Sequence, residues 1–279
     1  MQDFETSRRT FLAGALGVGL TACVPSGVTR SSSAPPYDGR LGVQLYTVRY
    51  LFEQDYAGTL AALAKIGFKD CETAGYFAHD PRAVRSAMDG LGLVSRSGHI
   101  RLNELQDGFA KQLETAAIMG QRSLYLGWIP EEERTPDKYR ALADLLNTRG
   151  EAAKAANIQL GYHNHDFEFA DLGGVKGYDI LLERTDPSLV AMEIDFYWAA
   201  QAGVDPRDLF ARAPGRFHSC HIKDRKADGS MVSVGEGQID FAGILSEARK
   251  AGLETFYVEH DEPADPIASV AASYAYLTR

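Results

Sequence analysis

Four short apolar runs in the second half of the sequence each lead directly into side chains that can bind a divalent metal. The residues at these positions are His163 and His165, Glu193 and Asp195, His221, and Glu259. Imidazole and carboxylate groups at the ends of successive strands can converge on one cation. Folding alone does not require these residue types at all of these positions, so the pattern predicts a metal-dependent enzyme.

Side chains two positions apart on a strand point to the same face of that strand. His163 and His165 are therefore expected to share one face, and so are Glu193 and Asp195, with Glu193 one layer deeper. A single buried histidine is usually a satisfied core residue. Agreement among four strand ends favours a ligand set instead.

Three other residues at or near expected strand ends are candidates for chemistry. His99 is a candidate general base or acid, unless it only bonds to a rim loop. Lys223 follows His221 by two residues and is expected to hold a substrate oxygen or an enolate, with a surface lysine as the alternative. Glu72 is expected to touch the substrate or the groups around the metal, unless it pairs with an arginine such as Arg49.

From Leu41 onward the sequence alternates short strand-like runs with longer helical patterns, which predicts an α/β fold. Strands are expected at 41–45, 68–72, 93–99, 122–126, 158–163, 189–195, 216–222 and 255–259. Helices are expected at 56–66, from Asp80-Pro81 onward, and at 103–119, 136–156, 177–185, 205–213, 240–250 and 265–277.

Eight strand–helix units in roughly 240 residues are the usual size of a (β/α)8 TIM barrel, so residues 41–279 are predicted to form one catalytic domain. The active site of such a barrel lies at the carboxyl ends of its strands, where the histidines and acids fall. A doubly wound open sheet is the second possibility. It would normally show a glycine-rich turn after its first strand, and Gln44–Thr47 is not one.

Residues 1–22 are predicted to be a twin-arginine signal peptide. Ser7–Leu12 carries the Arg-Arg pair, and the apolar stretch that follows, Phe11–Leu20, is too short to span a bilayer. Leu20–Cys23 resembles a lipobox, which predicts lipidation at Cys23 and a flexible tether over residues 23–40. We therefore expect a periplasmic lipoprotein that meets the membrane only through its lipid anchor. The alternative is a fortuitous Arg-Arg pair with an uncleaved anchor.

Composition limits the partners of the chain. Its 279 residues include 29 Lys+Arg and 38 Asp+Glu, and this net charge of −9 argues against binding nucleic acid, which needs a basic face. Cys71 and Cys220 lie inside strand-like runs and are expected to be buried thiols. The sequence contains no Cys-x-x-Cys motif that would support structural zinc.

Five groups of residues resemble the sugar phosphate isomerase/epimerase superfamily of xylose isomerase-like TIM barrels. In chain order they are Val43–Arg49, Tyr162–Phe169, His221–Asp224, Gly235–Gly237 with Ile239–Phe241, and Tyr257–Glu259. The resemblance covers nearly everything from Leu41 to Leu277. It implies an enzyme that acts on a small carbohydrate with one divalent metal, either Mn, Mg, Co or Zn.

In that superfamily Glu, Asp, His and Glu from four strands commonly hold the metal, which implies His163, Asp195, His221 and Glu259 as ligands here. His163 is a departure, because relatives with a Glu-Asn-His strand end carry a carboxylate at this position. Either His163 binds the metal directly, or Glu168 reaches back from the following loop.

The resemblance also assigns residues around the substrate. Trp198 stands where some relatives carry a catalytic histidine, and its aromatic face suits stacking on a sugar ring. The predicted substrate-binding residues are Glu72, Trp198 and Glu168. The predicted catalytic residues are Glu259, His99, His165 and Lys223.

Relatives that epimerise a sugar use two metal-bound glutamates on opposite faces of the substrate, and only Glu259 clearly remains here. One base with a separate acid suits β-elimination better than epimerisation. An exported enzyme should rarely meet sugar phosphates, so we expect a non-phosphorylated keto-sugar or glycoside. Some superfamily members cleave 3-keto-glycosides by losing the C1 substituent after proton loss at C2, a step that a metal assists by stabilising the enolate.

Other functions are also consistent with parts of the sequence. A ketose or aldose isomerase or epimerase is one alternative, and a non-catalytic sugar-binding lipoprotein is another. Apurinic endonucleases share the barrel, but Trp198 replaces their histidine after the sixth strand, and no Asp-x-His follows the seventh strand.

Overall fold

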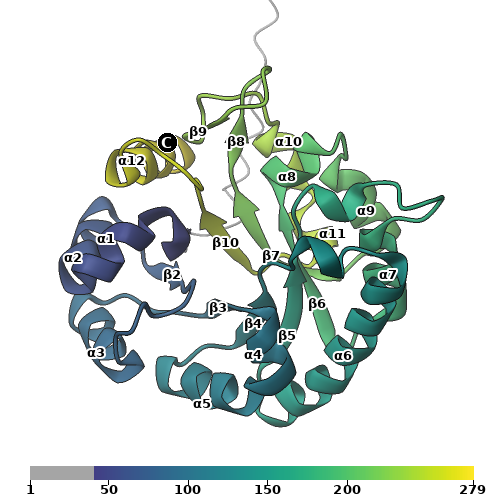
Figure 1. Cartoon of the computed structure of the whole chain (residues 1–279). Coiled ribbons are helices and arrows are strands. Elements are labelled where there is room, and N and C mark those ends of the chain that lie inside the picture. Colours follow the sequence, from purple (N-terminus) through teal and green to yellow (C-terminus); the bar gives the residue numbers. More distant parts are fainter. Residues whose placement is uncertain (1–40) are drawn as a thin grey trace, which may run out of the picture. The chain divides into compact units, whose positions relative to one another are not determined.

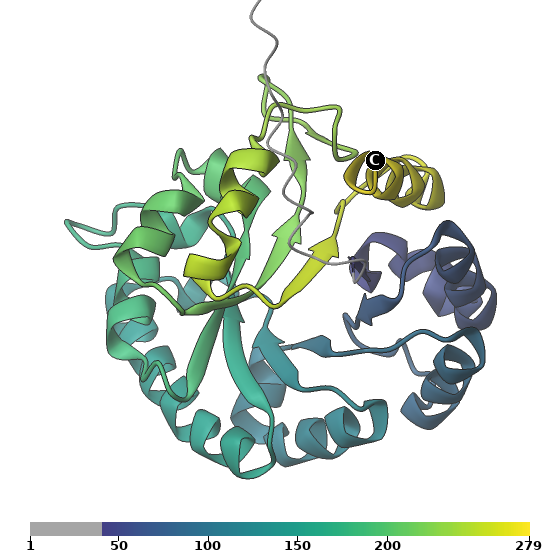
Figure 2. The ribbon, with the colours of Figure 1, turned by 180° about the vertical axis from the view of Figure 1, so that it is seen from behind.

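The structure, a computed structural model, describes residues 41–279. The predicted signal peptide, the predicted tether and Cys23 lie outside the described residues. Eight parallel strands form a nearly closed barrel surrounded by helices, which confirms the predicted (β/α)8 fold (Figures 1 and 2). The barrel strands are β1 (Gly42–Gln44), β2 (Asp70–Glu72), β3 (Ser97–Ile100), β4 (Ser123–Leu126), β5 (Gln159–His163), β6 (Val190–Asp195), β7 (Phe217–Ile222) and β10 (Thr255–Val258).

Neighbouring strands of the barrel follow chain order, and β10 pairs with β1 to bring the end of the chain beside its beginning. Strands β2 and β3 share no continuous ladder. The segments that contain them are joined by two isolated parallel bridges, Asp70 with Val94 and Thr73 with Gly98, and the Ser97 hydroxyl donates to Glu72. The ring of strands is therefore nearly closed, and its weakest pairing lies between β2 and β3.

The helices lie outside the strands, most of them at the predicted places. They are η1 (Leu45–Val48), α1 (Arg49–Gln54), α2 (Tyr56–Ile66), α3 (Pro81–Leu91), α4 (Leu102–Asp107), α5 (Phe109–Met119), η2 (Glu131–Glu133), α6 (Pro136–Ala155), η3 (Phe167–Phe169), α7 (Gly177–Arg184), α8 (Phe196–Gln201), α9 (Pro206–Arg212), α10 (Phe241–Ser246), α11 (Ala248–Ala251) and α12 (Pro266–Leu277).

Two helices expected to be continuous are each divided into two. The predicted helix at 103–119 breaks at Gly108, which caps α4 and starts α5, because glycine is a poor residue for a helix interior. The predicted helix at 240–250 divides at Glu247. Neither break moves the flanking strands out of the barrel.

Four helices begin with the same local device, a capping side chain followed by proline. The oxygen of Asp80, Thr135, Asp205 or Asp265 accepts a hydrogen bond from a backbone N–H of the first turn, and the next residue is proline. The capping oxygen accepts from one of the first backbone N–H groups of the helix, which lack partners inside it. Proline has no N–H, so it adds no further group that needs a partner. These caps fix the residue at which each helix starts.

Two tyrosine rings fill the inside of the barrel where the opposing residue is glycine. A Cβ at Gly161 would overlap the ring of Tyr125, and a Cβ at Gly42 would overlap the ring of Tyr257. Tyr125 and Tyr257 are 1% and 0% exposed, so these rings close the floor beneath the strand ends.

The loop after β7 carries a small hairpin, β8 (Asp224–Arg225) and β9 (Met231–Val232), which the sequence did not predict. The carboxylate of Asp224 accepts hydrogen bonds from the backbone N–H groups of Gly235, Gly237 and Ile239, at 2.9, 2.9 and 3.2 Å. The backbone N–H of Arg225 also donates to this carboxylate, so the buried Asp224 side chain ties the residues after β9 to the end of β7.

In the described part of the chain, residues 41–279, none of the helices has the length and apolar character needed to cross a membrane.

Candidate active site

The carboxyl ends of the barrel strands bring the predicted residues together. Glu72 ends β2, His163 ends β5, Asp195 ends β6, His221 lies one residue from the end of β7, and Glu259 follows β10. None of these five side chains belongs to a residue more than 5% exposed. His99 joins them from β3, so six strands contribute to one buried polar cluster.

Asp195, His221 and Glu259 direct three ligand atoms toward one another at the mouth. Nδ1 of His221 lies 3.9 Å from Oδ2 of Asp195 and 2.6 Å from Oε2 of Glu259. Within residues 41–279 these three buried atoms have no hydrogen-bond partner of acceptable geometry. Nε2 of His163 adds a fourth candidate ligand atom, 3.7 Å from Oδ2 of Asp195. Imidazole nitrogens and carboxylate oxygens of this kind fit a divalent cation.

Two deeper carboxylates, Glu193 and Glu72, contact the ring nitrogens of His163 and His221 that point away from the mouth. Oε2 of Glu193 lies 3.2 Å from Nδ1 of His163 and 2.6 Å from Nε2 of His99. Oε2 of Glu72 lies 2.6 Å from Nε2 of His221. A histidine that binds a metal commonly donates its other N–H to a carboxylate, which fixes the ring and its tautomer. Glu193 and Glu72 can therefore orient His163 and His221 with one nitrogen toward the mouth.

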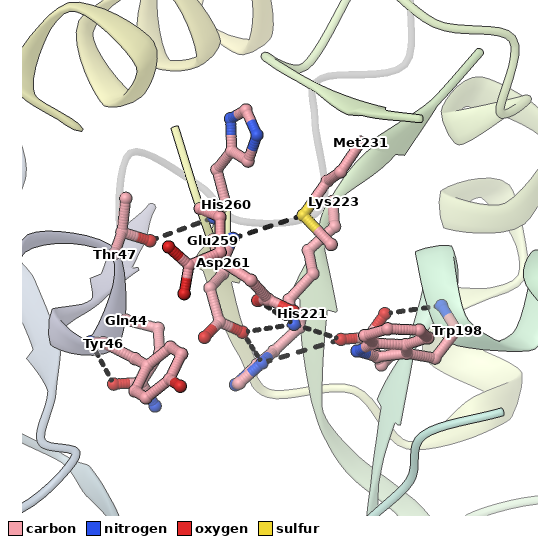
Figure 3. Close-up of polar contacts among 12 residues, drawn as sticks. Gln44, Tyr46, Thr47, Trp198, His221, Lys223, Met231, Glu259, His260 and Asp261 are labelled. Carbon is pink, nitrogen blue, oxygen red and sulfur yellow. Dashed lines mark hydrogen bonds and ion pairs between the residues drawn. The ribbon is translucent and has the colours of Figure 1, made fainter. Parts of the chain in front are cut away.

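Lys223 places a buried positive charge against the same ligand atoms. Its Nζ lies 2.9 Å from Oδ2 of Asp195, 2.8 Å from Oε2 of Glu259 and 2.8 Å from Oδ1 of Asp261, and Figure 3 shows it reaching this group from β7. Lys223 is 2% exposed, which excludes the surface-lysine alternative. The ammonium group is also 5.8 Å from the centre of the Trp198 ring.

Burial and neighbouring charges set the protonation of the cluster. Burial, together with the charge of His221, lowers the pKa of His163 to about 3, so this ring keeps a free lone pair at neutral pH. Burial opposes the charge on His221, but Glu193 and Glu259 hold its pKa well above the usual range. A metal at the mouth must therefore displace a proton from His221.

The pKa values of Glu259 and Asp195 shift in opposite directions. Burial opposes ionisation of Glu259, but Lys223 and His221 hold its pKa well below the usual range. Burial raises the pKa of Asp195 to about 6, and Lys223 only partly offsets this effect. Glu259 is accordingly a carboxylate at neutral pH, and its lowered pKa makes it a weaker base than Asp195.

Glu168 does not join the cluster. Its Oε1 accepts a 2.7 Å hydrogen bond from the Tyr162 hydroxyl, and its Oε2 accepts a 2.7 Å hydrogen bond from the backbone N–H of His165. Glu168 is 0% exposed, so both oxygens are used to hold the turn after β5. This geometry favours His163 over Glu168 as the ligand on β5.

The remaining predicted residues lie beside the mouth. The ring centre of His165 is 5.2 Å from that of His163 and 5.4 Å from that of Trp198. Trp198 is partly buried at the start of α8, where its backbone N–H donates to Asp195. Both rings are positioned to contact a molecule above the ligand atoms. Arg49 pairs with Glu262, so it is not the partner of Glu72.

Sequence reasoning gave no role to two functional neighbours. Glu193 was placed on the correct face, but its position at the centre of three imidazoles depends on contacts across the barrel. Asp261 lies two residues beyond Glu259 and pairs with Lys223. Asp261 could have been predicted from its spacing, because residues two apart in an extended segment point to the same side as Glu259 does.

Comparisons with known proteins agree with this architecture. The family model described as xylose isomerase-like TIM barrel matches residues 44–278. An inosose dehydratase of Geobacillus kaustophilus is 24% identical over 261 residues, covering 79% of this chain and 84% of that protein.

Two solved structures share the fold. A sugar phosphate isomerase/epimerase from Parabacteroides distasonis is 27% identical, with a TM-score of 0.74, over 91% of this chain and 97% of that one. The IOLI protein, solved with a bound zinc atom, is 16% identical, with a TM-score of 0.65, over 86% of this chain and 95% of that one. The family match spans nearly the whole described barrel, and the chain belongs to the xylose isomerase-like TIM barrel family.

Proposed function

We propose that this protein is a divalent-metal-dependent enzyme that removes a proton next to a carbonyl of a non-phosphorylated keto-sugar or glycoside and then eliminates the C1 substituent. The observation that carries the proposal is the engagement of both Glu168 oxygens within the turn after β5. With Glu168 held there and His163 at the end of β5, the site offers Glu259 as its base, while the other two glutamates of the cluster, Glu72 and Glu193, contact histidines.

Elimination needs one base and one acid, and the site supplies both. Glu259 takes the proton from C2, and the C–H electron pair forms the C1=C2 double bond. The C1–O bond breaks, and the departing oxygen takes a proton from His99, whose charged form is stabilised because Glu72 and Glu193 outweigh burial and raise its pKa. Lys223 holds the Glu259 carboxylate in place.

A metal held by His163, Asp195, His221 and Glu259 would draw electron density from the ketone oxygen and make the C2 proton more acidic. The donor set of two imidazoles and two carboxylates suits zinc, manganese or cobalt. The similarity to an inosose dehydratase supports elimination, because a dehydratase removes water from its substrate. We also propose that the protein acts outside the cytoplasm, where non-phosphorylated sugars are available.

The proposal is tested by NMR of the purified protein in deuterated water with methyl 3-keto-β-D-glucoside. We expect loss of the C2 proton together with release of methanol and appearance of an unsaturated keto-sugar. Deuterium at C2 without methanol release would instead establish an epimerase or isomerase. A metal-loaded protein that causes no exchange with this probe or with free ketoses would indicate a sugar-binding protein.

The matched variants are Glu259→Gln and Glu254→Gln. Glu259→Gln removes the base and is expected to lower turnover by at least roughly 100-fold. Glu254 lies in an exposed position before β10, at the other end of the same strand, so Glu254→Gln should retain wild-type turnover.

A further inference from the structure

Planar side chains form a continuous series from the buried cluster around His163 to Trp128 on the protein surface. The rings of His165 and Phe167 are 5.3 Å apart and nearly parallel, at 9°. The guanidinium carbon of Arg134 lies 3.5 Å from the Phe167 ring centre and 5.5 Å from that of Trp128. We call Trp128, Arg134, Phe167, His165 and Trp198 the aromatic track.

The outer end of the track is exposed, although its neighbours are fixed. Trp128 is 51% exposed, an unusual state for so large an apolar side chain. Arg134 donates from Nε and Nη2 to the carbonyl oxygen of Ile129, at 3.2 and 3.0 Å. Arg134 is therefore held between the two rings by the loop that also carries Trp128.

The inner end of the track offers ring nitrogens that the protein leaves unused. Within residues 41–279, Nε1 of Trp198 and Nδ1 of His165 are buried atoms with no hydrogen-bond partner. A buried polar atom without a partner costs free energy unless a ligand or water satisfies it. Aromatic faces beside unsatisfied polar atoms are the features that bind a sugar ring and its hydroxyl groups.

We propose that the aromatic track is a subsite for the leaving group of a glycoside, and that this leaving group is itself a ring. This inference rests on the proposed function, because the track begins at the cluster where the C1 bond would break. His165 and Trp198 contact the ring next to C1, and Phe167, Arg134 and Trp128 form the outer surface on which a second ring packs. Release of water alone, as in a dehydratase, would leave these outer groups without a role.

The first test measures binding to the full chain and needs no turnover. Titration calorimetry compares methyl β-D-glucoside with phenyl β-D-glucoside and with cellobiose. We expect phenyl β-D-glucoside, cellobiose, or both to bind roughly five- to tenfold tighter than the methyl glycoside, the usual gain from one ring stacked on an aromatic side chain. Preference for phenyl identifies an aromatic leaving group, and preference for cellobiose identifies a second sugar. Equal affinity for all three would overturn the proposal.

Trp128→Ala should abolish the tighter binding of the ring-bearing glycosides and leave the affinity for methyl β-D-glucoside unchanged. Trp128→Phe should retain most of the preference for the ring-bearing glycosides. Tyr276→Ala is the matched control, because Tyr276 is an exposed aromatic residue on α12, away from the track. A preference that survives Trp128→Ala would overturn the assignment. The chain contains only two tryptophans, both in the track, so quenching of their fluorescence by the ring-bearing probes is also expected.

The two proposals can fail separately. Release of methanol from the methyl 3-keto-glucoside with equal binding of the three glycosides would overturn the subsite alone. A Trp128-dependent preference without proton exchange at C2 would overturn the proposed reaction alone.

Discussion

The ammonium nitrogen of Lys223 lies 2.8 Å from Oε2 of Glu259, the oxygen that is also directed at the proposed metal position. One positive charge of the protein therefore already neutralises part of the ligand set. A metal bound at this position would compete with Lys223 for the carboxylate oxygens of Asp195 and Glu259, and this competition would set its affinity.

Lys223→Met should destabilise the metal-free protein. The substitution leaves Asp195, Glu259 and Asp261 without their shared cation, and removing one partner of a buried ion pair costs about 3 kcal/mol of unfolding free energy. Urea unfolding in a chelating buffer measures this loss. Excess manganese should then stabilise the variant more than the wild type, because the metal replaces the missing charge.

The control for this prediction is Lys250→Met. Lys250 is an exposed residue that pairs with Glu247 at 3.2 Å, and such pairs contribute little, so a change below about 0.5 kcal/mol is expected. A Lys223→Met protein that is as stable as the wild type in chelator would contradict the central role of Lys223.

His163→Ala and Glu168→Gln should separate the two possible ligands on β5. We expect His163→Ala to weaken metal binding by at least roughly tenfold, since even the partners of ligating residues have effects of this size. Glu168→Gln should bind metal as the wild type does. Metal content after dialysis against graded chelator, measured by mass spectrometry, gives both values, and the opposite ranking would identify Glu168 as the ligand.

Glu168 should make stability depend on pH. Burial raises its pKa from about 4.5 to about 7. A carboxyl with a raised pKa contributes stability that is complete below pH 4.5 and is lost as the pH rises through 7. The difference amounts to about 3 kcal/mol of unfolding free energy between pH 4.5 and pH 8.

Glu168→Gln resembles the protonated acid, because its amide can donate to the Tyr162 hydroxyl while its oxygen accepts from the His165 N–H. The variant should match the wild type at pH 4.5 and exceed it in unfolding free energy at pH 8. Parallel curves of unfolding free energy against pH for the two proteins would rule out the raised pKa.

Cys23→Ala should release the protein from the membrane. If Cys23 carries the lipid anchor, its loss leaves the exported chain without an attachment, and the protein should move from the membrane fraction to the soluble periplasmic fraction. Lys substitution of both Arg8 and Arg9 should keep the chain in the cytoplasm. Unchanged fractionation of Cys23→Ala would refute the lipobox prediction.

The sequence predicted the barrel because its strands are short apolar runs and its helices start with strong caps such as Thr135-Pro136. It did not predict α1 or α8, which are six residues each and depend on neighbouring contacts. The cap of α8 is Asp195, which sequence reasoning assigned only to a metal. Pattern alone cannot reveal that a proposed metal ligand also caps a helix.

The convergence of the proposed ligand residues was predictable because they end strands that meet at one mouth. The deeper contacts were not, because they join residues distant in the chain. The 2.6 Å contact of His99 with Glu193 links positions separated by 94 residues. It joins β3 to β6 across the inside of the barrel, so it depends on the arrangement of several strands and not on any one segment.

The hydrogen bonds from Gly235, Gly237 and Ile239 to Asp224 tie down the loop that follows β7. When a loop becomes ordered on binding, the chain entropy it loses makes the binding free energy less favourable. The Asp224 loop is ordered beforehand, so that entropy was already lost when the chain folded. We therefore expect ligand capture to proceed at a rate set by diffusion and desolvation, without a slow step of loop closure on this side of the barrel.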